Sequence, residues 1–249
     1  MIRFISDFPA LFITEKKVLT IADLHVGIER QIYQSGIIIP YQIEKFKEKI
    51  DYLIKLTKAS KLVILGDLKH EVPGISFQEI KDIPKLLEHL LSKVDIILVS
   101  GNHDSQISRI VPQKVKIYDS KGFKIGKFAF VHGHAWPSRS LLDCEYMITA
   151  HSHPSVEFWT ENFRSIEPCW LKCEIDNEKM FKKYKIKTKI KQGIIMPAFN
   201  HLIGGMAFNS KDFEPLGPLL KNEVFKWKNA KVYLLDGTFL GNLNKLKTR

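Results

Sequence analysis

Five short motifs of Asp, His and Asn interrupt this chain, and several follow directly on short apolar runs. The motifs are Asp23-Leu24-His25, Gly66-Asp67, Gly101-Asn102-His103-Asp104, His132-Gly133-His134 and His151-Ser152-His153. Residues 18–22, 62–65 and 96–99 have the length and composition of buried β-strands. Because α/β sheets place their ligand sites beyond the carboxyl ends of strands, this pattern predicts a fold in which the motifs converge.

The two halves of the chain differ in their periodicity. In the first half, apolar residues recur at helical spacing after Pro40 and again over residues 80–91. From residue 114 onward strand-like runs dominate, and the two runs around Gly122 predict a hairpin whose second strand delivers His132. Further strands are expected near residues 146–150, 156–159, 170–175, 193–199 and 231–235.

This shift from helices to strands favours two β-sheets that face each other, with helices on the outside. The expected fold class is α/β, a four-layer αββα sandwich of two mixed sheets. No break in composition separates two domains. We therefore expect a single domain over residues 1–249, with a less regular part from about residue 200.

Bulk composition sets wider limits. A hydrophobic content of 45% and a charged content of 26% are ordinary for a globular protein of 249 residues. No run approaches the ~18 apolar residues that cross a bilayer, and Asp7 and Pro9 come too early for a signal-peptide core. We expect no membrane partner and a cytoplasmic location. The net charge of +11 favours polyanionic partners such as nucleic acid without establishing one.

The three cysteines, Cys144, Cys169 and Cys173, are an odd number without a Cys-x-x-Cys pair. In a strand, Cys169 and Cys173 would lie roughly 13 Å apart at Cα, too far for a disulfide. We expect buried free thiols.

A lysine-rich run follows residue 178. Lys185, Lys187, Lys189 and Lys191 alternate with other residues, so in a strand the lysines would share one face. Two interpretations remain open at this point. The run could be an edge strand that uses lysine against aggregation, or the wall of a groove that follows a phosphate backbone.

The histidine and carboxylate set suits a site with two metal ions. Two divalent cations ~3.5–4 Å apart can clamp a phosphate ester and activate water for attack. Such a site needs a bridging carboxylate, for which Asp67 is the natural candidate. Asp23 and His25 would point to the same side if their backbone is extended, and His151 and His153 share this spacing. Asn102 would add an amide oxygen, and His132 completes the set.

His103 follows Asn102 and would project away from a metal bound there. It is therefore a candidate general acid or transition-state stabiliser, and Asp104 could hold its other ring nitrogen. Four imidazoles, two carboxylates and one amide, with no thiolate, suit Mn²⁺, Fe²⁺, Co²⁺, Ni²⁺ or Zn²⁺ better than Mg²⁺ or Ca²⁺. We expect two divalent transition-metal ions, with Mn²⁺ as the first choice.

In this order and spacing the motifs resemble those of the calcineurin-like metallophosphoesterase superfamily, D-x-H, GD, GNH[DE], a single His and GHxH. The one departure is Ala150, which stands where the family usually has glycine. The resemblance implies two mixed sheets flanked by helices. It also implies one metal bound by Asp23, His25, Asp67 and His153, a second bound by Asp67, Asn102, His132 and His151, and a catalytic role for His103.

The chain is further similar to small archaeal and bacterial phosphoesterases related to the SbcD nuclease subunit. The shared phrases are Asp23-Leu24-His25-Val26-Gly27-Ile28-Glu29, Leu65-Gly66-Asp67-Leu68-Lys69-His70-Glu71 and Met196-Pro197-Ala198-Phe199-Asn200. This likeness implies that His70 lies near the substrate, and His134 is expected to shape the same pocket. His89 and His201 lie outside the motifs.

The expected function is a dinuclear metal-dependent phosphodiesterase, a nuclease that cleaves DNA or RNA by attack of a metal-activated hydroxide. The alternative is a small-molecule phosphatase or a nucleotide phosphodiesterase, which the same core could support in a closed pocket. A scaffold without catalysis is disfavoured because every expected ligand position is filled. Protein partners are unknown at this level.

Overall fold

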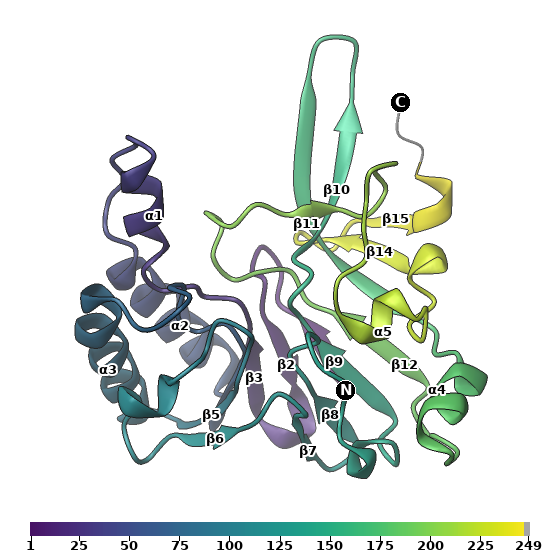
Figure 1. Cartoon of the computed structure of the whole chain (residues 1–249), viewed down its shortest axis with the longest axis horizontal. Coiled ribbons are helices and arrows are strands. Elements are labelled where there is room, and N and C mark those ends of the chain that lie inside the picture. The colour runs from purple at the N-terminus through teal and green to yellow at the C-terminus, as the bar shows by residue number, and fades with distance from the viewer. Residues whose placement is uncertain (247–249) are drawn as a thin grey trace.

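A computed structural model of the chain describes residues 1–246, so the last three residues of the expected domain lie outside the described part. Two β-sheets lie face to face with helices on their outer sides (Figure 1). The first sheet has six strands in the order of the chain: β1 (Ile2–Phe4), β2 (Leu11–Ile13), β3 (Val18–Ile21), β4 (Lys61–Leu65), β5 (Asp95–Val99) and β6 (Lys116–Tyr118). Strands β3 to β6 are parallel and the first two pairings are antiparallel, so this sheet is mixed.

The second sheet has nine strands and is also mixed. Its strands are β7 (Phe123–Ile125), β8 (Phe128–Phe130), β9 (Tyr146–Thr149), β10 (Pro154–Trp159), β11 (Arg164–Cys173), β12 (Gln192–Ile195), β13 (Met206–Ala207), β14 (Lys231–Leu234) and β15 (Phe239–Asn242). Strands β8, β9 and β12 run parallel to one another, whereas β11 pairs antiparallel with β10, β12 and β14. The outer part of the β10–β11 hairpin projects beyond the rest of the sheet (Figure 1).

Three apolar clusters separate four layers. The helices are α1 (Ile28–Gln34), α2 (Ile43–Thr57), α3 (Phe77–Leu91), α4 (Asn177–Tyr184) and α5 (Gly217–Lys221). In β4, Leu62 and Ile64 face the cluster that holds the buried residues of α2 and α3. Val63 and Leu65 face the cluster between the sheets, together with Trp170. A third cluster covers the second sheet with residues of α4 and α5, and the expected four-layer αββα fold is confirmed.

The two helices expected in the first half are present. Helix α2 begins at Ile43, just after Pro40, and buries one face formed by residues such as Phe46 and Ile50. Helix α3 begins after Ser76, whose side chain accepts the Glu79 backbone N–H while Glu79 accepts the Ser76 N–H in return. This capping box gives a sharp helix start at the end of the loop that follows Asp67.

The prediction of a hairpin around Gly122 was wrong. The run before it becomes β6, which pairs in parallel with β5 of the first sheet. The run after it becomes β7, which pairs with β8 of the second sheet. The chain therefore crosses between the sheets near Gly122, and the hairpin turns between β7 and β8 instead. β8 still leads to His132, as expected.

The lysine-rich run is not a strand. Its first part is α4, because the Asp176 side chain accepts the Lys179 N–H and caps the helix. Residues 185–191 are irregular, and the N–H groups of Lys189 and Lys191 donate to Leu142 and Glu145 at 2.7 and 2.8 Å. These contacts lie at the start of β9, the opposite end from His151, so the run does not line the site that the motifs form.

The part of the chain from about residue 200 is more integrated than expected. Strand β14 pairs with β11 and thereby extends the second sheet, while Phe225 and Val232 are fully buried in its outer core. The three cysteines are free and buried, as expected. Within the described residues, no helix has both the length and the apolar character needed to cross a bilayer.

Candidate metal centre

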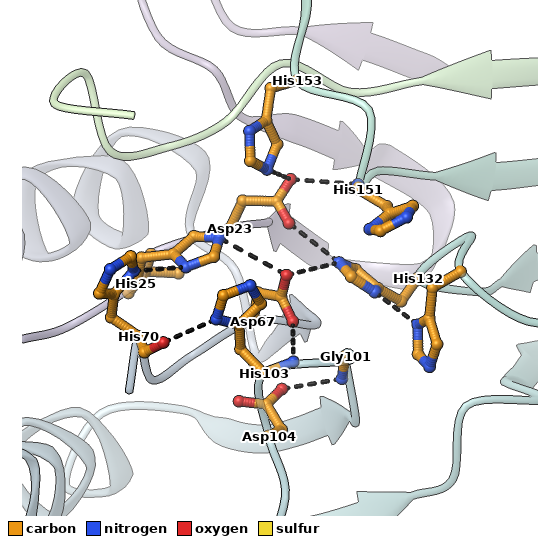
Figure 2. A network of polar contacts seen from close by, with 12 residues as sticks. Asp23, His25, Asp67, His70, Gly101, His103, Asp104, His132, His151 and His153 are labelled. Atoms are coloured by element: carbon orange, nitrogen blue, oxygen red, sulfur yellow. Dashed lines mark hydrogen bonds and ion pairs between the residues drawn. The ribbon is translucent and has the colours of Figure 1, made fainter. Parts of the chain in front are cut away.

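The five motifs meet at one edge of the two sheets (Figure 2). Asp23 follows β3, Asp67 follows β4 and His103 follows β5, all in the first sheet. From the second sheet, His132 follows β8, and His151 and His153 follow β9. Because the strands that carry these motifs run parallel within each sheet, their carboxyl ends bring the motifs together.

Left-handed backbone conformations aim these side chains. Among residues other than glycine, positive φ angles occur at Asp23 (54°), His25 (43°), Asp67 (46°), His151 (69°) and His153 (41°). Such conformations are unfavourable for L-residues and concentrate at functional sites. The backbone at Asp23 and His25 is therefore not extended, so the condition under which both side chains would point to the same side is not met. The two side chains still reach one site, because both residues turn in the same unusual way.

Two glycines allow the close approach of the motifs. Gly66 has φ of 83°, and a Cβ atom there would lie 2.2 Å from the His132 ring. A Cβ atom at Gly101 would lie 2.1 Å from Oδ1 of Asp67. Both distances are impossible for real atoms, so a side chain at either position would push a site residue away. The glycines of the GD and GNH motifs are thus required by packing around Asp67.

The two carboxylates are buried and surrounded by imidazoles. The Nε2 atom of His132 lies 3.0 Å from Oδ1 of Asp23, and the His151 backbone N–H donates to Oδ2 of Asp23 at 3.3 Å. The His103 backbone N–H donates to Oδ1 of Asp67 at 2.8 Å. The other oxygen of Asp67 lies 3.5 Å from Nε2 of His25 and 3.6 Å from Nε2 of His132.

These side chains form two adjoining groups that fit metal ions. Each group places one donor atom per residue within 4.8 Å of the others: Asp23, His25 and His153 in one, and Asp67, His132 and His151 in the second. The Nε2 atoms of His25 and His153 are buried and have no hydrogen-bond partner among the described residues. Buried nitrogens normally have a partner. Nε2 of His25 lies 3.5 Å from a carboxylate oxygen of Asp67, and Nε2 of His153 lies 3.6 Å from one of Asp23. A divalent cation could occupy the place between such a ring nitrogen and a carboxylate, and at His153 it would displace the ring proton.

The pKa values of the four candidate histidine ligands are shifted in two directions. Burial lowers the pKa of His25 to about 2 and that of His151 to about 3, so both imidazoles are neutral near pH 7. Burial acts in the same direction on His132 and His153, but hydrogen bonds and charge from Asp23 raise their pKa values on balance. For Asp23, burial raises the pKa, but His153 and His132 together hold it well below its usual range.

His70 and His134, expected as substrate contacts, each lie against a candidate ligand. Nδ1 of His70 is 3.2 Å from Nδ1 of His25, and Nδ1 of His134 is 2.8 Å from Nδ1 of His132. Nε2 of His70 bonds to Oε1 of Gln31, which can only accept. His70 must therefore carry its proton on Nε2 and accept from Nδ1–H of His25. That tautomer leaves Nε2 of His25 free for a metal.

The hydrogen bonds around His103 differ from those expected, because Asp104 does not contact the His103 ring. Nδ1 of His103 donates to the backbone carbonyl of His70 at 2.6 Å. Asp104 instead accepts the backbone N–H groups of Gly101 and Lys69, at 2.8 and 3.2 Å. Asp104 is fully enclosed, and burial raises its pKa to about 6. The expectation that Asp104 holds the His103 ring was wrong, because its oxygens are taken up by the backbone that shapes the loop.

Asn102 is exposed at the edge of the site. Its backbone is fixed by its neighbours, since Gly101 bonds to Asp104 and His103 to Asp67. His89 lies outside the site and pairs with Asp51 at 2.8 Å.

Two residues that support the site were not predicted from the sequence. Glu79 is buried and accepts three backbone N–H groups, those of His70, Glu71 and Ser76. It therefore fixes the loop between Asp67 and α3, and its Ser-x-x-Glu spacing could have revealed the capping box. Gln31 offered no comparable signal, because only the fold brings α1 next to His70.

Comparisons with known proteins agree with this geometry. The family model for calcineurin-like phosphoesterases matches residues 16–187, a range that includes all five motifs. The crystal structure of the Pseudomonas putida nuclease MPE is similar to this chain, with a TM-score of 0.57 and 18% sequence identity. The similarity covers 92% of this chain and 89% of the nuclease chain. At this low identity it shows a common fold alone. The E. coli phosphoesterase YfcE is 20% identical over 59% of this chain and 75% of its own, with a TM-score of 0.37. No curated protein sequence matches the chain. Since the family match covers more than half of the chain and every motif lies within it, this protein is a member of the calcineurin-like phosphoesterase family and a hydrolase of phosphoric esters.

Proposed function

We propose that the protein is a phosphodiesterase with two metal ions, and that its substrate is nucleic acid. The observation that supports this most strongly is the pair of donor groups around Asp23 and Asp67, with two buried Nε2 atoms that lack partners. Asp23, His25, Asp67 and His153 would hold one ion. Asp67, Asn102, His132 and His151 would hold the other. Imidazole, carboxylate and amide donors favour Mn²⁺ as the native metal, with Fe²⁺, Co²⁺, Ni²⁺ or Zn²⁺ as substitutes.

When bound, the two ions would neutralise the phosphate charge and activate water as the nucleophile. The protein contributes the remaining steps. Asp23 and Asp67 set the spacing of the donors. His103 stands next to His25, with 4.6 Å between ring centroids, and its Nδ1–H is held by the carbonyl of His70. Nε2 of His103 is therefore its free atom, and in the protonated ring it can donate a proton to the leaving oxygen.

A nucleic-acid substrate is supported by charge and by likeness to nucleases. The net charge of +11 favours association with a polyanion. One of the solved structures with a similar fold is called a nuclease. The motif phrases shared with SbcD-related phosphoesterases point the same way. The lysine-rich run gives no local support, because it lies at the other end of β9.

The test is cleavage by metal-stripped protein after Mn²⁺ is restored. Single-stranded DNA, duplex DNA, RNA, bis-p-nitrophenyl phosphate and p-nitrophenyl phosphate would be compared. We expect cleavage of nucleic acid and of the diester, and loss of about a hundredfold or more in kcat for His103→Ala. Asp67→Asn should lose activity with every substrate. His89→Ala, which removes an imidazole outside the site, is the matched control and should retain full activity.

Turnover restricted to the monoester would contradict the proposal and favour a phosphatase. Absence of turnover with every metal and substrate would favour a scaffold.

A further inference from the structure

A pocket is lined by His153 and by residues outside the metal centre. It has a volume of about 460 Å³ and lies between the base of the β10–β11 hairpin, the loop after β12 and helix α2. Its polar lining residues are Asp7, Lys49, His153, Ser155, Asn200 and His201. His153 therefore belongs to both the metal centre and this pocket.

The loop after β12 is tied to the metal centre. The Asn200 backbone N–H donates to the carbonyl of Asp23 at 3.4 Å, and its side-chain amide donates to the carbonyl of Leu24 at 2.8 Å. Its side-chain oxygen accepts the N–H of Leu202 at 3.0 Å. Asn200 is fully buried. These bonds enclose His201 on both sides, so its backbone has a fixed position relative to Asp23.

The electrostatics of the pocket favour an anion. Lys49 is half-buried and forms no ion pair with any residue in the described part of the chain. His201 lines the same pocket as Lys49, and burial together with the charges of Lys49 and Lys45 lowers the His201 pKa. Asp7 is the single acid among the lining residues that the structure describes. An unpaired lysine beside a histidine in a partly enclosed pocket is a suitable partner for phosphate.

The walls of the pocket are apolar. They are formed by Pro9, Ile166, Pro168, Ala198, Phe199, Ile203 and Leu235. The volume falls within the ~300–1,000 Å³ typical of small-molecule sites, which combine apolar walls with a few polar groups. This combination suits the sugar and base of a nucleotide better than an isolated phosphate ion.

We infer that this pocket binds the nucleotide unit next to the scissile bond, with Lys49 and His201 contacting the neighbouring phosphate. The inference rests on the proposed phosphodiesterase function and deepens it, because it explains how the site would prefer a chain of phosphodiesters to a single one. His153 borders the metals and the pocket together, so one substrate strand can occupy both.

Two measurements test this pocket. The first compares kcat/KM for a trinucleotide that has two phosphodiesters with that for the dinucleotide that has one, using deoxythymidine and uridine versions of each. We expect the wild-type protein to prefer the trinucleotide in at least one sugar series. Lys49→Gln and His201→Asn should each lower this preference about fivefold, as for the loss of one partly exposed charge-assisted contact. Lys47→Gln is the matched control on the same helix, since Lys47 pairs with Glu44 at 3.3 Å and lines a different groove.

The second measurement does not depend on turnover. Metal-free protein is titrated with fluorescent oligothymidylate and oligouridylate at several salt concentrations. For Lys49→Gln, the slope of log affinity against log salt should fall by about 0.7, the value for one phosphate contact on a single strand. Lys47→Gln should keep the wild-type slope.

The two hypotheses fail in different ways. If the wild-type protein cleaves neither oligonucleotide, the proposed function fails, and the binding titration still decides whether the pocket holds phosphate. If cleavage is normal but neither Lys49→Gln nor His201→Asn changes the preference for the trinucleotide, the pocket inference is wrong. An unchanged salt slope in Lys49→Gln would contradict it equally.

Discussion

At the residue scale, the site depends on hydrogen-bond partners that decide which ring nitrogen of each histidine is free. The sequence predicted the six Asp and His residues that gather in the two donor groups of the site. It could not show that His70 accepts from His25, or that the His103 ring is held by a carbonyl instead of Asp104. Those contacts join residues 33 to 45 positions apart, and only the folded chain brings them together.

Gln31 is expected to tune metal affinity through His70 and His25. In Gln31→Leu the acceptor for Nε2–H of His70 is lost, so His70 can adopt the other tautomer and His25 loses its partner. The affinity for Mn²⁺, measured by calorimetry on stripped protein, should fall roughly tenfold. Gln31→Glu retains an acceptor and should bind Mn²⁺ nearly as well as wild type. Equal affinities in all three proteins would show that this hydrogen-bond chain is not needed.

Metal binding should release protons near neutral pH. The pKa values of His132 and His153 are raised on balance by Asp23, so both rings retain protons above the pH at which a free histidine loses them. A bound cation must displace those protons. Proton release on Mn²⁺ binding should therefore be larger at pH 7 than at pH 9, and affinity should weaken as the pH falls. Calorimetry in buffers of different ionisation enthalpy measures the number of protons released. If this number does not change with pH, His132 and His153 are not metal ligands that carry protons in the metal-free protein.

At the element scale, the apolar strands and the two long helices of the first half were predictable, but the pairing partners of the strands were not. Apolar runs that end at Asp23 and Asp67 became β3 and β4 of a parallel sheet, as their composition indicated. The runs around Gly122 joined different sheets, because each found its partner in a distant strand. Alternation suggested a strand for residues 185–191, but the Asp176 cap makes the preceding residues helical, and the run becomes a loop.

Glu79 is expected to stabilise the loop that carries His70. In Glu79→Ala, three backbone N–H groups lose a buried carboxylate acceptor. We expect a loss of about 3 kcal/mol in unfolding free energy, measured by urea denaturation. Glu79→Gln retains one acceptor oxygen and should lose less. Glu88→Ala, at an exposed position of the same helix, should stay within about 0.5 kcal/mol of wild type, and a similarly small effect of Glu79→Ala would rule out this role.

At the scale of the whole molecule, two sheets each contribute part of one centre. Asp23 and Asp67 come from the first sheet, and His132, His151 and His153 from the second. The cluster between the sheets, with Phe4 stacked on Trp170 at 4.2 Å, holds the two halves in register. The change from helical to strand periodicity along the sequence predicted that two sheets would face each other. The contribution of β14 to the second sheet was not predictable, because its pairing with β11 spans the whole C-terminal part.

The reactivity of the three cysteine thiols tests how tightly the second half of the chain is packed. All three are buried, and burial raises the pKa of Cys144 to about 11 and raises those of Cys169 and Cys173 further. Thiols with such pKa values react slowly at neutral pH. A chromogenic disulfide reagent should titrate no thiol in the native protein and all three in denaturant. A Lys47→Cys variant should show one additional thiol that reacts at once, and rapid labelling of a native cysteine would contradict this packing.

The carboxylates of Asp23 and Asp67, with their surrounding histidines, are expected to bind two metal ions per chain. The most direct measurement is titration of stripped protein with Mn²⁺, followed by calorimetry and by the electron paramagnetic resonance of the bound ions. The structure predicts two ions per chain that are magnetically coupled, because Asp67 lies within reach of both donor groups. Asp67→Asn should lose the coupling. Binding of one isolated ion, or of none, by the folded wild-type protein would contradict the account.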